Sequence, residues 1–155
     1  MLFLKRIEKE MMMITRDAVL NYTPRQMFEL VGGIENYPYF LPWCRGSQIH
    51  HQDEKRVEAT LDVAWSGLHK SFTTCNYLYP YERMDIVLIK GPVKHLEGQW
   101  HFIPYGERGC KVRLELKVEL IGSMVDRVFH PLFQHIANSL VDAFCNRARE
   151  IYEKD

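Results

Sequence analysis

Cysteine is scarce in this sequence, and its spacing limits what it can do. The 155 residues contain four, Cys44, Cys75, Cys110 and Cys145, with no CxxC pair and no histidine at ligand spacing beside them. This pattern argues against a structural zinc site, which gathers such pairs. Spacing alone leaves disulfides open, but nothing else marks the chain as secreted, so we expect reduced thiols.

Long apolar runs and net charge are also missing. No run approaches the roughly 18 apolar residues of a membrane-spanning helix, and the short apolar stretch before Lys5 falls below what a signal peptide needs. Twenty lysines and arginines balance twenty acidic residues, which argues against DNA binding and against attachment to lipid by charge alone. A local basic patch stays open. We predict a cytoplasmic protein with at most peripheral membrane contact.

Signatures of the common catalytic sites are absent from the sequence. It contains no GxSxG nucleophile motif and no glycine-rich phosphate loop after a predicted strand. Its seven histidines do not pair at metal-ligand spacing, and His130 and His135 are too far apart to share one helix face. We therefore expect no catalytic residues, no metal site and no resident cofactor.

One domain accounts for the length. A chain of 155 residues has the size of a single domain. Its 46% hydrophobic content is typical of globular proteins and argues against disorder. The run Met11-Met12-Met13 offers start codons besides Met1. We predict a single domain over 13–153, with residues 1–12 as a tail or the product of an upstream start codon.

The first elements predicted are a strand and two short helices. Apolar residues set among polar ones indicate a strand over 13–22. Thr23 and Gln26 have the spacing of a capping box, with a proline at the first helical position, so a helix begins here. It ends at Gly32-Gly33. Residues 34–42 form a second short helix or a tight turn.

The middle of the chain is predicted to be antiparallel sheet. We expect strands over 57–65, 70–79, 83–90, 93–103 and 111–120. In 111–120, aliphatic residues alternate strictly with charged ones, which indicates one buried and one solvated face. Short turns between these strands favour antiparallel pairing.

The last segment has a helical period. From Val125 to Ile151, apolar residues recur every three or four positions, with Ser123 as the candidate N-cap. A sheet with one apolar face needs a cover, and this helix is the only adequate one. We predict an α+β fold in which a curved antiparallel sheet wraps around the C-terminal helix. A wedge-shaped space lies between them, with the two short helices over one opening.

Three separated segments resemble one protein family. Residues 37–44, YPYFLPWC, resemble the YPxFxPWC signature of the START-like coenzyme Q-binding and polyketide cyclase-like proteins of the SRPBCC superfamily. Residues 91–104 resemble their GPFxxLxGxWxFxP segment, and residues 144–152 their closing FxxRAxxxY pattern. The resemblance covers 13–153 and implies the helix-grip (START/Bet v 1-like) fold. Val93 stands where an aromatic residue is commoner, which we expect to widen the pocket locally.

The resemblance implies two functions and no catalytic residues. In one branch the domain binds ubiquinone or another polyprenyl quinone and supports respiration, and this is the function that we predict first. In bacteria the domain is also described as a ribosome-association toxin that binds the large (50S) ribosomal subunit and blocks 70S formation. A third reading is a cyclase or aromatase, which would need an acid–base pair that the sequence does not suggest.

A hydrophobic ligand would lie between sheet and helix, where we predict ten lining residues. They are Phe40, Leu41 and Trp43 at the mouth, Leu61, Trp65, Trp100 and Phe102 on strands, and Phe129, Phe133 and Ile136 on the helix. Aromatic faces suit a flat ring, since an aromatic pair gains about 0.5–1.5 kcal/mol beyond burial. The alternative reading is that these residues only fill the core.

Binding to the ribosome would instead use cations on the surface. The candidates are Lys5, Arg6, Lys9, Arg25, Arg45, Lys111, Arg113, Lys117, Arg147 and Arg149. They are interspersed with acidic residues, so no patch is visible in the sequence. The alternative for each is an ordinary mixed surface.

Overall fold

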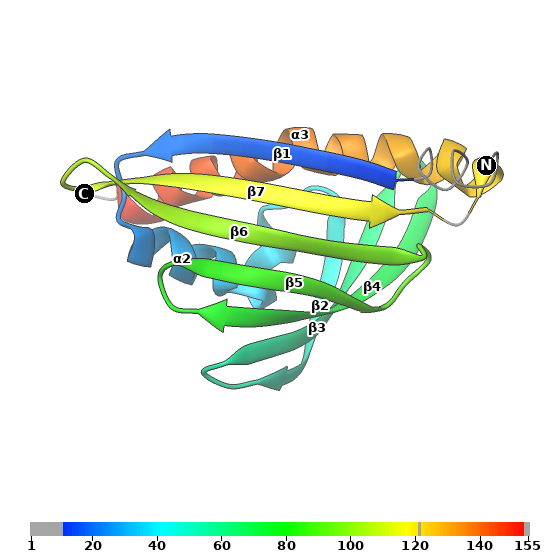
Figure 1. The fold of residues 1–155 in the computed structure, drawn as a ribbon, viewed down its shortest axis with the longest axis horizontal. Coiled ribbons are helices and arrows are strands. Elements are labelled where there is room, and N and C mark those ends of the chain that lie inside the picture. Colours follow the sequence, from blue (N-terminus) through cyan, green and yellow to red (C-terminus); the bar gives the residue numbers. More distant parts are fainter. Residues whose placement is uncertain (1–10, 121, 154–155) are drawn as a thin grey trace, which may run out of the picture.

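Seven strands form one antiparallel sheet in the order β1-β7-β6-β5-β4-β3-β2 (Figure 1). The computed structural model describes residues 11–120 and 122–153, with the backbone alone over 123–128. The strands are β1 (Met11–Leu20), β2 (Cys44–Gln52), β3 (Arg56–Trp65), β4 (Leu68–Tyr79), β5 (Arg83–Lys90), β6 (His95–Tyr105) and β7 (Gly109–Glu119). The helical segments are α2 (Pro24–Gly32), the 3-10 helix η1 (Ile34–Tyr39) and α3 (Ser123–Tyr152).

The start of the chain follows the prediction closely, with one correction. β1 begins at Met11 rather than at residue 13, because Met12 pairs with Val118 and is buried in the core. Residues 1–10 of the predicted tail lie outside the described residues. The capping box of α2 is confirmed: Thr23 Oγ1 accepts a hydrogen bond from the Gln26 amide at 3.1 Å, and Gln26 Oε1 accepts from the Thr23 amide at 2.8 Å.

The five strands predicted for the middle of the chain are all present. A sixth strand there, β2, was not predicted. β2 is an edge strand paired only with β3, and its register shifts twice, between Cys44 and Gly46 and between Ile49 and His51. Such irregularities break the alternation of apolar and polar residues that marks a strand. β7 shows the opposite case, since its aliphatic residues alternate in burial as predicted.

The C-terminal helix runs unbroken from Ser123 to Tyr152. Gly122 occupies the N-cap position, so Ser123 is the first helical residue and not the cap. The predicted apolar face is buried from Phe129 to Ala148. Ile151 is 37% exposed, because it lies in the last turn, beyond most of the sheet. Val125 falls among the side chains that are not described.

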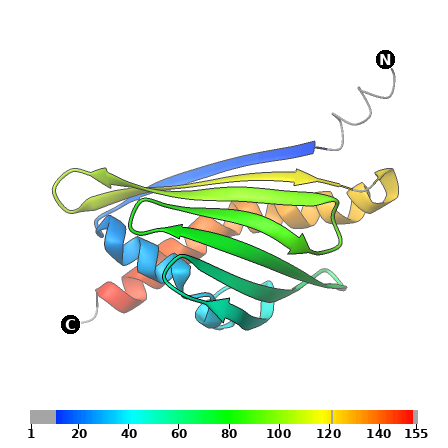
Figure 2. The same cartoon turned by 60° about the horizontal axis from the view of Figure 1, so that its bottom comes forward.

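The sheet curls around one side of α3, which confirms the predicted architecture. Figures 1 and 2 show α3 behind the sheet, with α2 and η1 at the end where α3 finishes. The backbone of α3 approaches β1 most closely, whereas the strands from β5 to β2 curve away from it. Long side chains must therefore fill the space between α3 and these strands.

Candidate functional site

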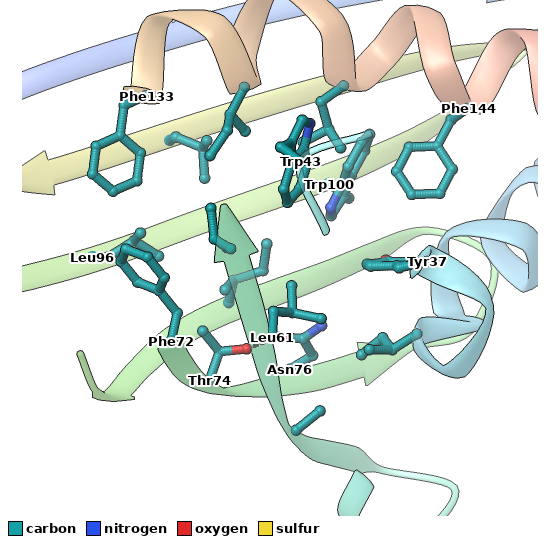
Figure 3. A pocket seen from close by; sticks show the side chains of 17 residues that line it. Tyr37, Trp43, Leu61, Phe72, Thr74, Asn76, Leu96, Trp100, Phe133 and Phe144 are labelled. Carbon is teal, nitrogen blue, oxygen red and sulfur yellow. Dashed lines mark hydrogen bonds between the residues drawn. The ribbon is translucent and has the colours of Figure 1, made fainter. Parts of the chain in front are cut away.

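A cavity of about 120 Å³ lies between α3 and the concave face of the sheet. Seventeen residues from η1, five strands, α3 and the segment before β2 line it (Figure 3). They are Ile34, Tyr37, Trp43, Ala59, Leu61, Val63, Phe72, Thr74, Asn76, Ile86, Leu96, Trp100, Leu116, Phe133, Ile136, Leu140 and Phe144. Most are apolar, so the cavity suits an apolar guest.

Aromatic side chains close both ends of this cavity. At one end Phe72 of β4 meets Phe133 of α3 edge to face, with ring centroids 5.8 Å apart. At the other end the Phe144 ring of α3 lies 5.3 Å from Tyr37 of η1 and 5.4 Å from Trp100 of β6. Figure 3 shows the two groups at opposite sides of the view. These contacts fix η1 as the cover of one opening.

The cover is also held by a buried hydrogen bond. The Tyr37 hydroxyl donates to the carbonyl oxygen of Val31, in the last turn of α2. Burial, with smaller contributions from Cys44 and Glu35, raises the pKa of the Tyr37 phenol above its usual range. The phenol therefore stays protonated at neutral pH and serves as a structural donor rather than as a base.

Two polar groups stand out in the apolar wall. Asn76 is the one buried polar or charged residue of the described part of the chain, and its Oδ1 accepts a hydrogen bond from Thr74 Oγ1 at 3.3 Å. Trp43 Nε1 is buried and has no hydrogen-bond partner within the residues described. A buried donor without a partner costs free energy. It would gain a bond from a guest that brings an oxygen acceptor into the cavity.

The lining offers little to acid–base catalysis. Among the described lining residues, none is a histidine, aspartate, glutamate, lysine or arginine. General acid–base chemistry needs such a group within hydrogen-bond reach of the reacting atom. The described residues also contain no group of three or more histidine, cysteine or carboxylate side chains able to hold a metal ion.

Five of the ten predicted lining residues lie on the cavity wall. These are Trp43, Leu61, Trp100, Phe133 and Ile136. Figure 3 shows the rings of two of them, Trp43 and Trp100, side by side near the middle of the view. Whether any of them contacts a ligand stays a prediction.

The other five predicted residues lie elsewhere, each for a local reason. Phe40 follows η1 directly and is half-buried between the Phe144 ring, 5.2 Å away, and the Arg147 guanidinium, whose carbon lies 5.4 Å from the Phe40 ring centroid. Leu41 is buried beside it without reaching the cavity. Trp65, at the end of β3, stacks on the His135 imidazole with ring centroids 5.6 Å apart. Of the three residues predicted at the mouth, Trp43 therefore lines the cavity, whereas Phe40 and Leu41 do not.

Phe102 and Phe129 are core residues outside the cavity wall. The Phe102 ring packs edge to face against Phe28 of α2, 5.4 Å away, because β6 has by then passed under α2. The Phe129 ring lies one turn before Phe133 and packs against it at 6.4 Å. Val93 is buried but does not line the cavity, so the predicted local widening there is wrong.

The sequence prediction does not include several residues of the cavity wall. Phe72, Thr74 and Asn76 alternate along β4 and share its inner face. Two of them are polar, which hid the alternation of an inward-facing strand. Tyr37 and Phe144 belong to the segments that resemble the family, but those segments alone do not place them in the pocket.

The predicted ribosome-binding cations are scattered over the surface. Lys5, Arg6 and Lys9 lie outside the described residues. Three others form ion pairs at the surface: Arg25 with Glu29, Arg113 with Asp17, and Arg147 with Glu150. Surface pairs of this kind contribute little to stability. No helix in the described part of the chain has the length and hydropathy to cross a membrane.

Comparison with known proteins places the chain in a family. A family model described as polyketide cyclase/dehydrase and lipid transport matches residues 20–145. The ribosome association toxin RatA of Pseudomonas aeruginosa is 42% identical over 139 residues, covering 90% of this chain and 96% of that protein. The coenzyme Q-binding protein COQ10 homolog B of Xenopus laevis is 26% identical over 153 residues, covering 96% of this chain and 60% of that protein.

Solved structures support the fold. The aromatase/cyclase ZhuI from Streptomyces sp. R1128 superimposes with a TM-score of 0.83 at 13% identity, covering 91% of this chain and 96% of that one. At this identity the likeness concerns the fold alone. It confirms the predicted helix-grip architecture.

Proposed function

Because the chain belongs to the polyketide cyclase/dehydrase and lipid-transport family, and resembles RatA over nearly its whole length, we propose that it associates with the ribosome. In this proposal it binds the large subunit and blocks joining to the small one. The observation that carries it is the 42% identity to a ribosome association toxin that the chain covers almost completely. The function is an interaction and involves no catalytic step.

Quinone carriage, the function that the sequence reading put first, has weaker support. The relative named for coenzyme Q binding is 26% identical, and the chain spans 60% of it. A dry cavity of about 150 Å³ holds a single benzene ring, so 120 Å³ does not hold a polyprenyl tail. A polyprenyl quinone would have to displace wall side chains such as Phe133 or Phe144.

A smaller ligand is the second candidate, and one observation favours it. The unpartnered Trp43 Nε1 and the buried Asn76 lie in an otherwise apolar wall. A ring-sized molecule with a carbonyl oxygen would accept a hydrogen bond from the Trp43 Nε1–H or from the Asn76 amide. Organic extraction of the purified protein followed by mass spectrometry tests this, and extracts identical to a solvent blank would rule it out. The cyclase reading comes third, since the described lining carries no acid–base pair.

Sedimentation tests the ribosome proposal. The purified protein is mixed with separated large and small subunits and centrifuged through sucrose gradients at about 50 mM salt, where phosphate contacts are strong. We expect the protein to travel with the large subunit, with the small subunit as internal control. Light scattering on mixing both subunits should show less 70S formation. Protein that stays at the top of the gradient with either subunit would refute the proposal.

A further inference from the structure

A row of five side chains crosses the outer face of the sheet. The strand register places Tyr79 of β4 opposite Arg83 of β5, and Arg83 opposite His101 of β6. It then places His101 opposite Arg113 of β7, and Arg113 opposite Asp17 of β1. α3 lies behind the sheet in both views, so this face is the one toward the viewer (Figure 2).

The row brings basic side chains side by side. Two arginines flank a histidine on three neighbouring strands, with Arg83 on β5, His101 on β6 and Arg113 on β7. Each basic side chain has one acidic neighbour: Arg83 Nε lies 2.8 Å from Asp85, His101 Nε2 lies 3.6 Å from Glu115, and Arg113 Nη2 lies 3.5 Å from Asp17. A guanidinium carries five N–H donors, so these contacts leave donors free.

Arg113 is accessible at the end of its guanidinium. Its side chain is 36% exposed, although its Nε is buried and has no hydrogen-bond partner among the residues described. Its Nη2 lies 3.5 Å from Asp17 Oδ2. The terminal N–H groups are therefore the donors that an anionic oxygen above the sheet would reach.

An exposed aromatic ring stands at the end of the row. Tyr79 is 43% exposed, and the Arg83 guanidinium carbon lies 4.2 Å from its ring centroid. Tyr77, two residues before it on the same face, is equally exposed and lies opposite Arg56 of β3. Proteins that bind unpaired RNA bases combine such rings and guanidinium planes for stacking with cations for the phosphates.

The charges also divide along the strands. Across β5 to β7, the adjacent row holds Asp85, Gln99 and Glu115 in register, and the row beyond it pairs Glu97 with Lys117. On the opposite side of the Arg83 row lies Lys111, opposite Ile103. The acidic side chains therefore gather in the row next to Arg83, and a polyanion is repelled there and attracted toward the Arg83 row and Lys111.

We propose that the first four residues of this row, Tyr79, Arg83, His101 and Arg113, form a docking surface for ribosomal RNA. An unpaired base stacks on the Tyr79 ring or on the Arg83 guanidinium, and backbone phosphates bind the free donors of Arg83 and Arg113. The inference rests on the proposed ribosome association and names its partner as RNA. It uses the outside of the sheet, so it does not depend on the cavity.

Two double variants, which each lose two cations relative to the wild type, test the surface. R83Q with R113Q removes two cations from the row, whereas K90Q with K117Q removes two cations that lie outside it. Binding is measured against intact large subunits and against protein-free RNA extracted from them, over a range of salt. The row variant should bind about tenfold more weakly or worse, with a salt slope smaller by about 1–2. The control should stay within about threefold.

A third variant separates stacking from charge. Tyr79→Leu keeps an apolar side chain and removes the ring, so affinity should fall about tenfold while the salt slope stays unchanged. Circular dichroism and urea unfolding check that each variant is folded. Because Tyr79 is exposed, this variant keeps the test valid even if loss of Arg113 were to weaken the fold.

Each outcome has a distinct meaning. If the wild type binds subunits and both R83Q/R113Q and Tyr79→Leu bind as tightly, the docking surface is wrong and the ribosome proposal stands. If the wild type binds subunits but not the extracted RNA, the partner is a ribosomal protein and the RNA inference is overturned. If the wild type binds neither, the proposed function fails and the inference fails with it.

Discussion

Trp100 and Phe144 meet edge to face, with ring centroids 5.4 Å apart and planes at 85°. Trp100 belongs to β6 and Phe144 to α3, so this contact joins sheet and helix directly at one end of the cavity. The same Phe144 ring lies 5.2 Å from Phe40 and 5.3 Å from Tyr37. One side chain thereby ties together the sheet, the long helix and the segment that covers the cavity.

Replacing this ring should therefore cost much of the stability. Phe144 is 1% exposed, and Phe→Ala at a buried site destabilises by about 3–5 kcal/mol. We expect Phe144→Ala to lower the free energy of unfolding in urea by this amount. Tyr39→Ala is the matched control, because Tyr39 is an aromatic residue of the same cover but 79% exposed. A surface change of that kind stays within about 0.5 kcal/mol. Equal losses for the two variants would contradict the role given to Phe144.

Removing the unpartnered donor of Trp43 should have a different effect. Trp43→Phe deletes the buried Nε1–H, which recovers about 1–3 kcal/mol of desolvation cost, and removes ring volume, which costs a similar amount. The two effects oppose each other, so we expect a net change below about 1 kcal/mol in urea unfolding. A ligand that accepts a hydrogen bond from Nε1 should be recovered in smaller yield from this variant. A loss above about 3 kcal/mol would mean that the indole N–H is paired in solution.

The fold was readable from the sequence because its signals are local and regular. The capping box at Thr23 and Gln26 and the alternation along 111–120 depend on near neighbours, and both appear as expected. β2 was not predicted, because its two register shifts and its edge position remove the alternation of apolar and polar residues.

Only half of the predicted residues line the cavity, because the twist and curvature of the sheet decide which inward-facing side chains border it. Trp100 and Phe102 share one face of β6, but Trp100 lines the cavity while Phe102 packs on Phe28. The spacing of residues along a strand shows which face of the sheet a side chain is on. It does not show which part of the helix lies over that side chain. The docking row could not be predicted from the sequence for a related reason: recognising it requires the pairing register of five strands.

Gly98 offers a test of how tightly the inner face of the sheet is packed. A Cβ built on Gly98 would lie 2.6 Å from Leu116 Cδ2 and 2.9 Å from the carbonyl oxygen of Glu115. The leucine tip can turn away, but the backbone oxygen of β7 cannot move without disturbing the pairing. We expect Gly98→Ala to destabilise by about 1–3 kcal/mol, as overpacking does. Gln99→Ala, at the next position on the outer face, should change the free energy of unfolding by less than about 0.5 kcal/mol. A neutral Gly98→Ala would mean that β6 and β7 separate easily.

Asp53 should make stability depend on pH in a narrow acidic window. The His51 side chain, 2.7 Å from Asp53 Oδ2, and the amides of Lys55 and Arg56, 2.8 and 2.9 Å from Oδ1, lower the pKa of the Asp53 carboxyl to about 2. A carboxyl whose pKa is lower in the folded than in the unfolded chain adds stability above its unfolded pKa of about 4. That stability is lost as the pH falls through 2.

Asp53→Asn should therefore flatten the curve of unfolding free energy against pH between about 4 and 2. The asparagine Oδ1 can still accept from the two backbone amides, so the variant isolates the charge from the turn geometry. Glu54→Gln is the control, because the Glu54 carboxylate forms no ion pair or hydrogen bond among the described residues. Urea unfolding at a series of pH values measures all three proteins. Since Asp53 is exposed, the difference from wild type should shrink as salt is added. Parallel wild-type and Asp53→Asn curves at low salt would show that the His51 contact does not form in solution.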